Sequence, residues 1–298
     1  MNETQDDHRL VEGLRDVAGA YDVVLCDVWG VLHDGMRVFA AANEALARFR
    51  AGGGTVVLIT NAPRPKGPVL RQLDEFGASR DAYDAIVTSG DVTLALMAER
   101  GAAPMYHIGP PRDFVLFEEF ESMMPVPVPR VALEQADYVL CTGLFDDETE
   151  TPEDYDSALD LMQRRGLSMI CANPDMVVHR GDQLLYCAGA LAARYTACGG
   201  TAIYAGKPHR PIYVRALEIA EGIRRRPISR TRVLAIGDGL RTDIAGAASF
   251  GIDSLFMLGG IHRDDFAGPD GLFDRRRYVD FIADIKQRPI GAMHELVW

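Results

Sequence analysis

The chain has 298 residues, of which 48% are hydrophobic and 25% are charged. This composition is close to the globular average and excludes wholesale disorder, and the length suits one large or two modest domains. Forty-three acidic and 31 basic residues give a formal net charge of -12. Such a balance argues against a general nucleic-acid or anionic-membrane binder, because those surfaces need clustered Lys and Arg.

Features of the termini, the apolar stretches and the cysteines bear on location. No stretch approaches the roughly 18 to 20 apolar residues of a membrane span, and the first ten residues, MNETQDDHRL, are polar rather than signal-like. Five cysteines form no CxxC pair, which is typical of reduced, mostly buried thiols. We therefore expect a cytoplasmic protein with no membrane partner.

Short apolar runs alternate with helix-like segments along the first 90 residues. Strand, helix and strand in succession indicate a parallel sheet with helical crossovers. The expected elements are a strand at 21–27, a helix at 38–50, a strand at 55–60, a helix at 68–76 and a strand at 85–87.

The same alternation returns after residue 200, with a helix at 211–221, a strand at 232–236, a helix at 244–250 and a strand at 254–258. Between the two blocks the regular alternation of strand-like and helix-like segments is lost, and prolines interrupt the chain. We therefore expect a Rossmann-like, doubly wound α/β core formed by residues 1–90 and 201–298, with residues 91–200 as an inserted α+β domain.

Polar residues at strand ends mark the candidate site, because ligands of doubly wound sheets bind outside the carboxyl ends of the strands. Asp27 ends the first strand and could attack phosphorus or hold a metal, although a turn-forming aspartate would look the same. Thr60 and Asn61 end the next, where a hydroxyl and backbone N–H groups could bind phosphate or simply cap a helix.

Two further segments carry candidate residues. Asp238 and Asp243 lie at either end of a glycine-containing loop that follows a strand late in the chain. Two carboxylates placed in this way suit a hard cation such as Mg²⁺. The alternative is a surface loop with two unrelated acids. Lys207 lies between a short strand and a helix, flanked by Gly206 and Pro208, and is better placed than an ordinary solvated lysine.

These residues, in this order, resemble the four motifs of the haloacid dehalogenase superfamily. Asp27 corresponds to motif I, Thr60 to motif II, Lys207 to motif III, and the GDGLRTD segment with Asp238 and Asp243 to motif IV. The phrases DVWGVLHDG, TNAP, NPD and GKP are most similar to class IIA, which includes nucleotide, 4-nitrophenyl phosphate and pyridoxal phosphate phosphatases. The insertion then resembles a C2-type cap.

The resemblance implies a Mg²⁺-dependent phosphatase that acts on a small phosphorylated metabolite, such as a sugar phosphate or a nucleotide. Asp27 would be the nucleophile, and Thr60, Asn61 and Lys207 would bind the phosphoryl group. Mg²⁺ would be held by Asp27, the backbone carbonyl of Trp29 and Asp238, with Asp243 orienting these ligands. Whether the chain forms a homo-oligomer is left open.

The chain departs from the family pattern at Trp29. The usual motif I reads Asp-x-Asp-Gly, in which the second aspartate protonates the leaving oxygen, whereas this chain reads Asp27-Val28-Trp29-Gly30. An indole has no titratable proton near neutral pH and cannot do this. His33 or Asp34 would be the replacement acid, or the enzyme would be slow or specific for good leaving groups.

Several alternatives stay open at the level of sequence. The chain could be a catalytically weakened ligand-binding or regulatory protein, or, less readily, a dehalogenase, which would not need the Asp238 and Asp243 pair. Within the insertion, the Asn-Pro-Asp segment predicts substrate contacts through Asn173 and Asp175, with an ordinary Asn-Pro turn as the alternative. Trp29 could also stack on a flat substrate or fill space beneath the cap.

Overall fold

The computed structural model describes residues 9–123, 128–180, 183–283 and 285–298. The polar residues 1–8, on which part of the location prediction depends, lie outside the described residues. Among the helices of the described residues, none is both long and apolar enough to cross a membrane. All five cysteines are free, and four of them are buried, which confirms that they are mostly buried thiols.

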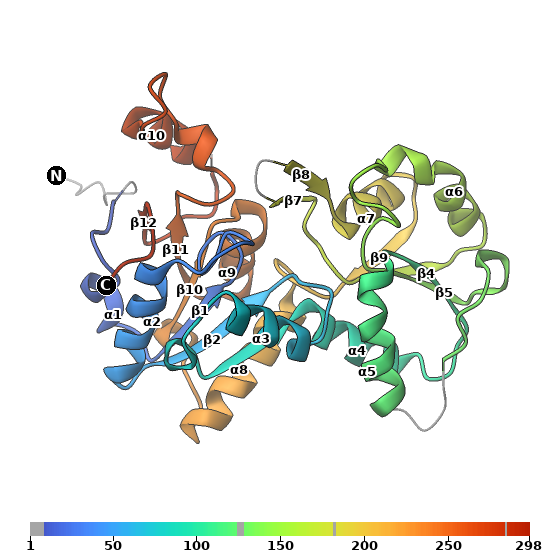
Figure 1. The fold of residues 1–298 in the computed structure, drawn as a ribbon, viewed down its shortest axis with the longest axis horizontal. Coiled ribbons are helices and arrows are strands. Elements are labelled where there is room, and N and C mark those ends of the chain that lie inside the picture. Colours follow the sequence, from blue (N-terminus) through green and yellow to red (C-terminus); the bar gives the residue numbers. More distant parts are fainter. Residues whose placement is uncertain (1–8, 124–127, 181–182, 284) are drawn as a thin grey trace. The chain divides into compact units, whose positions relative to one another are not determined.

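The chain forms two compact units (Figure 1). The first contains Met1–Ile59, Gln72–Ile86 and Tyr213–Trp298, and the second contains Thr60–Arg71 and Val87–Ile212. Residues 60–71, 87–90 and 201–212, which the sequence analysis assigns to the core, therefore belong to the second unit by their contacts. The division into a hydrolase core and a cap at residues 91–200 stays a prediction.

The first unit is built on a six-stranded sheet in the order β12-β11-β10-β1-β2-β3. Strand β1 is parallel to both β10 and β2, and β11 is parallel to β10 and β12. Chain order thus reverses between β1 and β10, which makes the sheet doubly wound and places a switch point there. The strands are β1 (Val23–Asp27), β2 (Thr55–Thr60), β3 (Ala85–Thr88), β10 (Val233–Gly237), β11 (Asp253–Met257) and β12 (Gly291–Met293).

Helices connect these strands, as the alternating pattern predicts. Helix α2 ends at the triple glycine, where Gly53 adopts a positive φ of 88° that a side chain would disfavour. The helices are α1 (Arg15–Ala18), α2 (Ala40–Ala51), α3 (Lys66–Glu75), α8 (Arg210–Arg224), α9 (Ala245–Phe250) and α10 (Arg275–Ala283), with shorter turns η1 (Arg80–Ala82), η5 (Arg230–Arg232), η6 (Leu240–Ile244) and η7 (Arg263–Phe266).

The second unit has a four-stranded parallel sheet in the order β4-β5-β6-β9 and a separate antiparallel hairpin, β7-β8. The strands are β4 (Met105–Ile108), β5 (Tyr138–Cys141), β6 (Ser168–Cys171), β7 (Val177–Arg180), β8 (Gln183–Tyr186) and β9 (Thr201–Tyr204). The helices are α4 (Ser89–Glu99), α5 (Val115–Met123), α6 (Asp156–Arg164) and α7 (Ala188–Ala197), with η2 (Pro111–Phe114), η3 (Leu133–Gln135) and η4 (Pro152–Tyr155).

Burial explains why the central strands read as continuous apolar runs. Every residue of β1, β2 and β10 is buried, as expected for parallel strands whose two faces are both covered. A polar residue at the end of such a strand therefore has no packing reason to be there. The α/β fold class with a Rossmann-like parallel sheet is confirmed.

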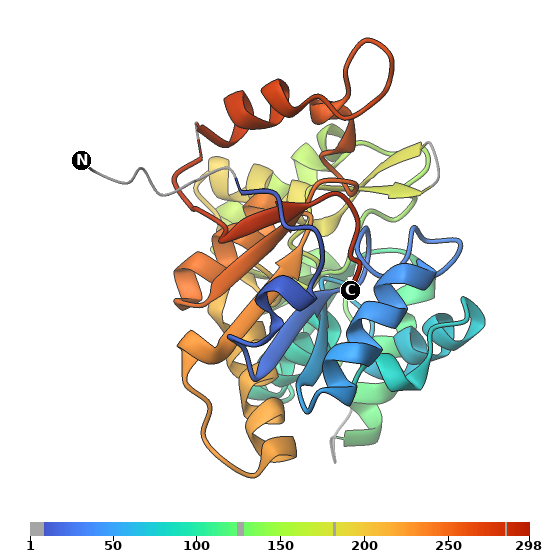
Figure 2. The same cartoon turned by 90° about the vertical axis from the view of Figure 1, so that its left-hand side faces the viewer.

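The two ends of the described chain lie together at the edge of the first sheet (Figure 2). The Val11 N–H donates to the Ala292 carbonyl at 2.9 Å, and the Ala292 N–H donates to the Arg9 carbonyl at 2.9 Å. The Leu14 N–H likewise donates to the Val297 carbonyl at 2.8 Å. The N-terminal segment thus extends the sheet beyond β12.

Candidate active site

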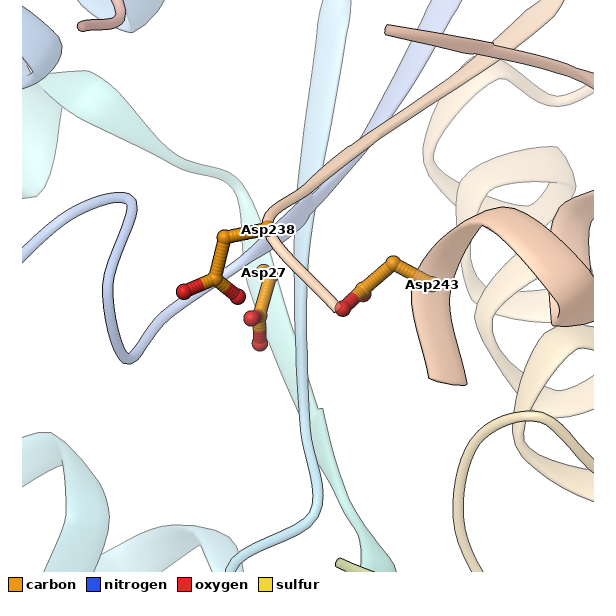
Figure 3. Close-up of side chains that lie close together, drawn as sticks. All are labelled: Asp27, Asp238 and Asp243. Carbon is orange, nitrogen blue, oxygen red and sulfur yellow. The ribbon is translucent and has the colours of Figure 1, made fainter. Parts of the chain in front are cut away.

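Three carboxylates predicted to act together meet in the first unit. Each of Asp27, Asp238 and Asp243 is buried, and one oxygen from each lies within 4.8 Å of the other two. Figure 3 shows the Asp27 and Asp238 carboxylates side by side, with that of Asp243 approaching from its own turn. These are the acidic ligands that motifs I and IV predict.

The topology of the sheet explains this convergence. Asp27 is the last residue of β1, and Asp238 directly follows β10. The two strands are parallel neighbours with Cys26 opposite Ile236, so their carboxyl ends reach the same edge. That edge is also the switch point of the doubly wound order, where ligands of such sheets bind.

Two glycines leave room for Asp238. A Cβ at Gly30, whose φ is +82°, would lie 2.0 Å from Asp238 Oδ2, and a Cβ at Gly260 would also lie 2.0 Å from that oxygen. The backbone N–H of Ile261 donates to the same Oδ2 at 2.8 Å. The carboxylate is therefore confined by backbone on two sides and held by an N–H group on the following loop.

Asp243 lies in the π-helical turn η6, directly before α9. Its Oδ2 accepts hydrogen bonds from the Gly239 N–H and from the Thr242 hydroxyl, both at 3.2 Å. A Cβ at Gly237 would lie 2.2 Å from its Cγ, so glycine is required there. Asp243 thus holds the loop that follows Asp238, and its orienting of metal ligands stays a prediction.

Trp29 packs against its own loop. A Cβ at Gly35 would lie 2.6 Å from Cζ2 of the indole, and the rings of Trp29 and His33 meet edge-on with centroids 5.2 Å apart. On its other side, His33 contacts Phe76 with centroids 5.1 Å apart. The indole therefore forms part of an aromatic cluster within the first unit.

Neither candidate replacement acid suits proton donation near neutral pH. Burial lowers the pKa of His33 to about 4, and its Nδ1 accepts the Gly35 N–H at 2.9 Å, so the ring is neutral. Burial raises the pKa of Asp34, but hydrogen bonds from the Arg37 and Met36 N–H groups outweigh this effect and leave the pKa lowered. Asp34 is thus ionised and caps its own turn.

A second group of predicted residues lies in the other unit. Thr60 is the last residue of β2 and Asn61 follows it, while Lys207 lies three residues beyond β9, and all three are buried. The Asn61 side chain hydrogen-bonds to the Lys207 backbone and to the Asp175 carboxylate. The structure therefore brings the residues of motifs II and III together with the Asn-Pro-Asp segment.

The Asn173 and Asp175 side chains both make internal hydrogen bonds. The Asn173 side-chain carbonyl accepts the Asp175 N–H at 3.1 Å, which is the local turn that the alternative interpretation describes. Asp175 accepts from Asn61 at 2.8 Å. Substrate contact by these two residues stays a prediction.

The residues that hold the acidic cluster in place were not among the predicted site residues. Thr242 bonds Asp243, while Gly260 and Ile261 form the loop that confines Asp238. One signal was present in the sequence, because two successive glycines, Gly259 and Gly260, follow the buried strand β11. A glycine pair at a strand end indicates a close backbone approach.

Comparison with known proteins agrees with this geometry. A family model described as haloacid dehalogenase-like hydrolase matches residues 24–121, and a second, HAD-hydrolase-like, matches residues 204–276. A crystal structure of a haloacid dehalogenase-like hydrolase from Brucella suis 1330 is 45% identical, with a TM-score of 0.84 over 97% of this chain and 100% of that one. The chain belongs to the haloacid dehalogenase-like hydrolase family. The superfamily and the hydrolase class predicted from the motifs are thereby confirmed.

Two curated relatives are more distant members. The D-glycerol 3-phosphate phosphatase of Mycobacterium tuberculosis is 28% identical over 84% of this chain, which spans 66% of that protein. The ribonucleotide monophosphatase NagD of Escherichia coli K12 is 27% identical over 80% of this chain and 88% of its own length. These relatives have different named substrates, so similarity to them does not select one for this hydrolase.

Proposed function

We propose that this hydrolase is a Mg²⁺-dependent phosphatase that cleaves phosphoric monoesters of small metabolites through an aspartyl-phosphate on Asp27. The observation that carries the proposal is the buried cluster of Asp27, Asp238 and Asp243, with oxygens within 4.8 Å of one another. The phosphatase names of both curated relatives support the reaction class. Their substrates, glycerol 3-phosphate and ribonucleotides, define the range to be tested.

The chemistry of the donor set fits Mg²⁺. All three side chains offer carboxylate oxygens, the ligands that this hard cation prefers, and three buried carboxylates this close repel one another unless a cation offsets their charge. Asp27, the Trp29 backbone carbonyl and Asp238 would hold the ion, and Asp243 would orient them. When bound, the ion reduces the repulsion between the Asp27 carboxylate and an anionic phosphate.

The chain's own residues account for the covalent step. A carboxylate oxygen of Asp27 attacks phosphorus, the bond from phosphorus to the ester oxygen breaks, and the alkoxide leaves with that electron pair and takes a proton from water. Thr60 and Lys207 would donate hydrogen bonds to the phosphoryl oxygens and offset their charge. Water then cleaves the aspartyl-phosphate, which releases inorganic phosphate and restores Asp27.

Protonation of the leaving oxygen distinguishes this chain from the usual family pattern. Trp29 has no proton to give, His33 is neutral with a pKa of about 4, and Asp34 is ionised. We therefore expect faster turnover of substrates with good leaving groups, which depart without protonation. The same observation favours a second candidate function, a member that binds a phosphorylated ligand and turns it over slowly.

The proposal includes a division of labour between two parts of the chain. Residues 1–90 and 201–298 would carry the chemistry, and the cap at residues 91–200 would select the substrate by covering the phosphoryl group and excluding water. Within that cap, the sequence alone predicts substrate contacts through Asn173 and Asp175, and the structure does not show them. We propose no nucleic-acid or membrane partner.

Phosphate release from a panel of sugar phosphates, glycerol phosphate, nucleotides and aryl or acyl phosphates tests the proposal. We expect release that requires Mg²⁺, stops with EDTA and is lost in Asp27→Asn, while the control Asp270→Asn, at an exposed loop position, keeps it. Wild-type enzyme quenched during turnover should carry a hydroxylamine-sensitive phosphoryl group. Phosphate binding without release would favour the second candidate, and release without Mg²⁺ would overturn the metal assignment.

A further inference from the structure

We infer that Asn61 is a positioning residue that fixes the backbone of Lys207, and that Asp175 in turn fixes the amide of Asn61. The inference rests on the proposed function only in taking Lys207 as a phosphate-binding residue. It is drawn from hydrogen bonds among three loops of the second unit, which follow strands β2, β6 and β9.

The Asn61 amide holds Lys207 by two hydrogen bonds. Its Oδ1 accepts the Lys207 backbone N–H at 2.7 Å, and its Nδ2 donates to the Lys207 carbonyl at 3.1 Å. Paired bonds of this kind fix both the position and the orientation of a peptide segment. We call this pair of hydrogen bonds the Asn61 clamp. Lys207 is 146 residues away in sequence, so the clamp joins two distant loops.

A third bond completes the use of the amide. Nδ2 also donates to Asp175 Oδ1 at 2.8 Å, so both of its hydrogens are engaged. A flipped amide would place NH₂ against the Lys207 N–H and the carbonyl against a carboxylate. The Asn61 side chain, only 4% exposed, therefore has no donor left for a phosphate, and contact with phosphate would have to come from its backbone.

Neighbouring residues leave room for the clamp and hold Asp175. A Cβ at Gly206 would lie 2.3 Å from Asn61 Oδ1, so glycine precedes Lys207 for a steric reason. The Asp175 N–H donates to Asn173 Oδ1, and the Asp175 carbonyl accepts the Gly189 N–H, each at 3.1 Å. The Asp175 loop is therefore anchored to the start of α7.

The clamp fixes the backbone position from which the Lys207 side chain extends. A charged amine binds a phosphoryl group well only when its backbone is held, since a misplacement of about 1 Å can cost on the order of 100-fold in rate. Asn61 supplies that restraint, and Asp175 acts through Asn61 rather than on the substrate. Replacing Asp175 should thus affect all substrates alike.

The test compares Asn61→Ala, Asp175→Ala, Asp175→Asn and the double alanine variant. We expect kcat/KM to fall by about 10- to 100-fold in Asn61→Ala, by the same factor for every substrate, with weaker inhibition by inorganic phosphate. Asp175→Ala should show a smaller uniform loss, and Asp175→Asn, which keeps an acceptor oxygen, should restore most of it. The double variant should be no worse than Asn61→Ala, because Asp175 acts through Asn61.

Hydrogen exchange at the Lys207 backbone amide gives a readout that does not depend on activity. We expect this amide to be protected in the wild type and to exchange at least tenfold faster in Asn61→Ala. The control Tyr195→Phe removes another buried hydrogen bond of the same unit, from the Tyr195 hydroxyl to the Leu167 carbonyl at 2.6 Å, and should leave Lys207 protected.

Several outcomes would overturn the inference. Unchanged exchange at the Lys207 amide in Asn61→Ala would show that Asn61 does not hold this backbone. Additive losses in the double variant would show that Asp175 acts independently of Asn61. A changed ratio between substrates in Asp175→Ala, with phosphate inhibition intact, would make Asp175 a substrate contact instead. A wild type that releases no phosphate would refute the proposed function, whereas the exchange experiment would still decide the clamp.

Discussion

Trp29 stands where the usual family pattern has an aspartate, and its ring packs within its own loop. Its ring covers Gly35 and meets His33, whose other side contacts Phe76. The indole thus packs within the turn after motif I, and His33 connects that turn to Phe76. Loss of the acid and gain of aromatic packing occur at one position, and a substitution there can separate them.

Trp29→Asp restores the family pattern and tests the missing acid. Turnover of alkyl phosphates, which have poor leaving groups, should rise by about 100-fold or more relative to aryl and acyl phosphates, because general acid catalysis is typically worth about 10²- to 10⁴-fold. Steady-state rates on both classes measure this ratio. Trp29→Asn is the control, since it loses the same packing without gaining a proton, and an equal ratio in both variants would contradict the hypothesis.

The half-buried imidazole of His107, in the second unit, should make the protein less stable in acid. Burial beside Phe117 and the nearby Arg130 charge lower its pKa to about 4, while an unfolded histidine titrates near 6.5. Between these values the unfolded chain binds more protons, so stability should fall as the pH falls from about 6.5 to about 4. Since the ring is only half-buried, we expect the free energy of unfolding to fall by about 1 to 2 kcal/mol between pH 7 and pH 5.

Urea unfolding at the two pH values measures this effect. His107→Gln cannot titrate but keeps a polar group within reach of Thr142, whose hydroxyl lies 3.0 Å from His107 Nε2. The variant should lose less stability than the wild type on going from pH 7 to pH 5. An identical loss in both proteins would exclude His107 as a source.

At the scale of elements, two connections around β10 and β11 define the acidic cluster. The turn η6 places Asp243 against the loop after β10, and the loop after β11 encloses Asp238. These loops approach so closely that only glycine fits at Gly260. The acidic cluster, which we propose as the metal site, therefore depends on backbone shape as much as on its carboxylates.

Gly260→Ala should displace the Asp238 carboxylate, because the new Cβ would lie 2.0 Å from Oδ2 and 2.3 Å from Cβ of that residue. We expect Mg²⁺ affinity to fall by about 10- to 100-fold, the usual effect of disturbing the support of a metal ligand. Titration calorimetry with Mg²⁺ measures this directly.

Gly222→Ala is the matched control. Gly222 lies within α8, and nothing lies within 4 Å of its added Cβ. Alanine should raise the free energy of unfolding by about 0.5 to 1 kcal/mol through helix propensity and leave Mg²⁺ affinity unchanged. Equal Mg²⁺ affinities in the two variants would show that Gly260 does not shape the site.

At the scale of the first unit as a whole, the C-terminal residues support both the sheet edge and the site. The Gly259 N–H donates to the His294 carbonyl at 2.8 Å, next to the Ile261 N–H that binds Asp238. The Leu14 N–H donates to the Val297 carbonyl. One short segment therefore links the N-terminal segment, β12 and the loop around Asp238.

Removing residues 294–298 should lower Tm by several degrees and also reduce the stabilisation that Mg²⁺ provides. Each lost buried hydrogen bond is worth about 1 kcal/mol, and the Gly259 loop loses its support. Thermal unfolding with and without Mg²⁺ separates the two effects. A lower Tm with an undiminished Mg²⁺-induced shift would show that the segment supports the sheet alone.

Local sequence was enough to predict the strands and the residues that end them. The range 55–60 was predicted as a strand, and β2 spans Thr55–Thr60, because continuous apolar runs suit parallel strands covered on both faces. Asp27 and Asp238 were recognised since carboxylates at the ends of such runs have no packing role. Helix ends were less well predicted, since the helix predicted at 211–221 is α8, which spans Arg210–Arg224.

Contacts between distant residues were decided only by the tertiary structure. Asn61 bonds Lys207, which is 146 positions away, and Asp175, which is 114 positions away. The bond from Ile261 to Asp238 spans 23 positions. No periodicity or motif encodes such pairs, because each depends on where whole loops lie after the strands have paired. Sequence therefore determined which residues are candidates for the chemistry, and packing of the loops determined which residues hold them in place.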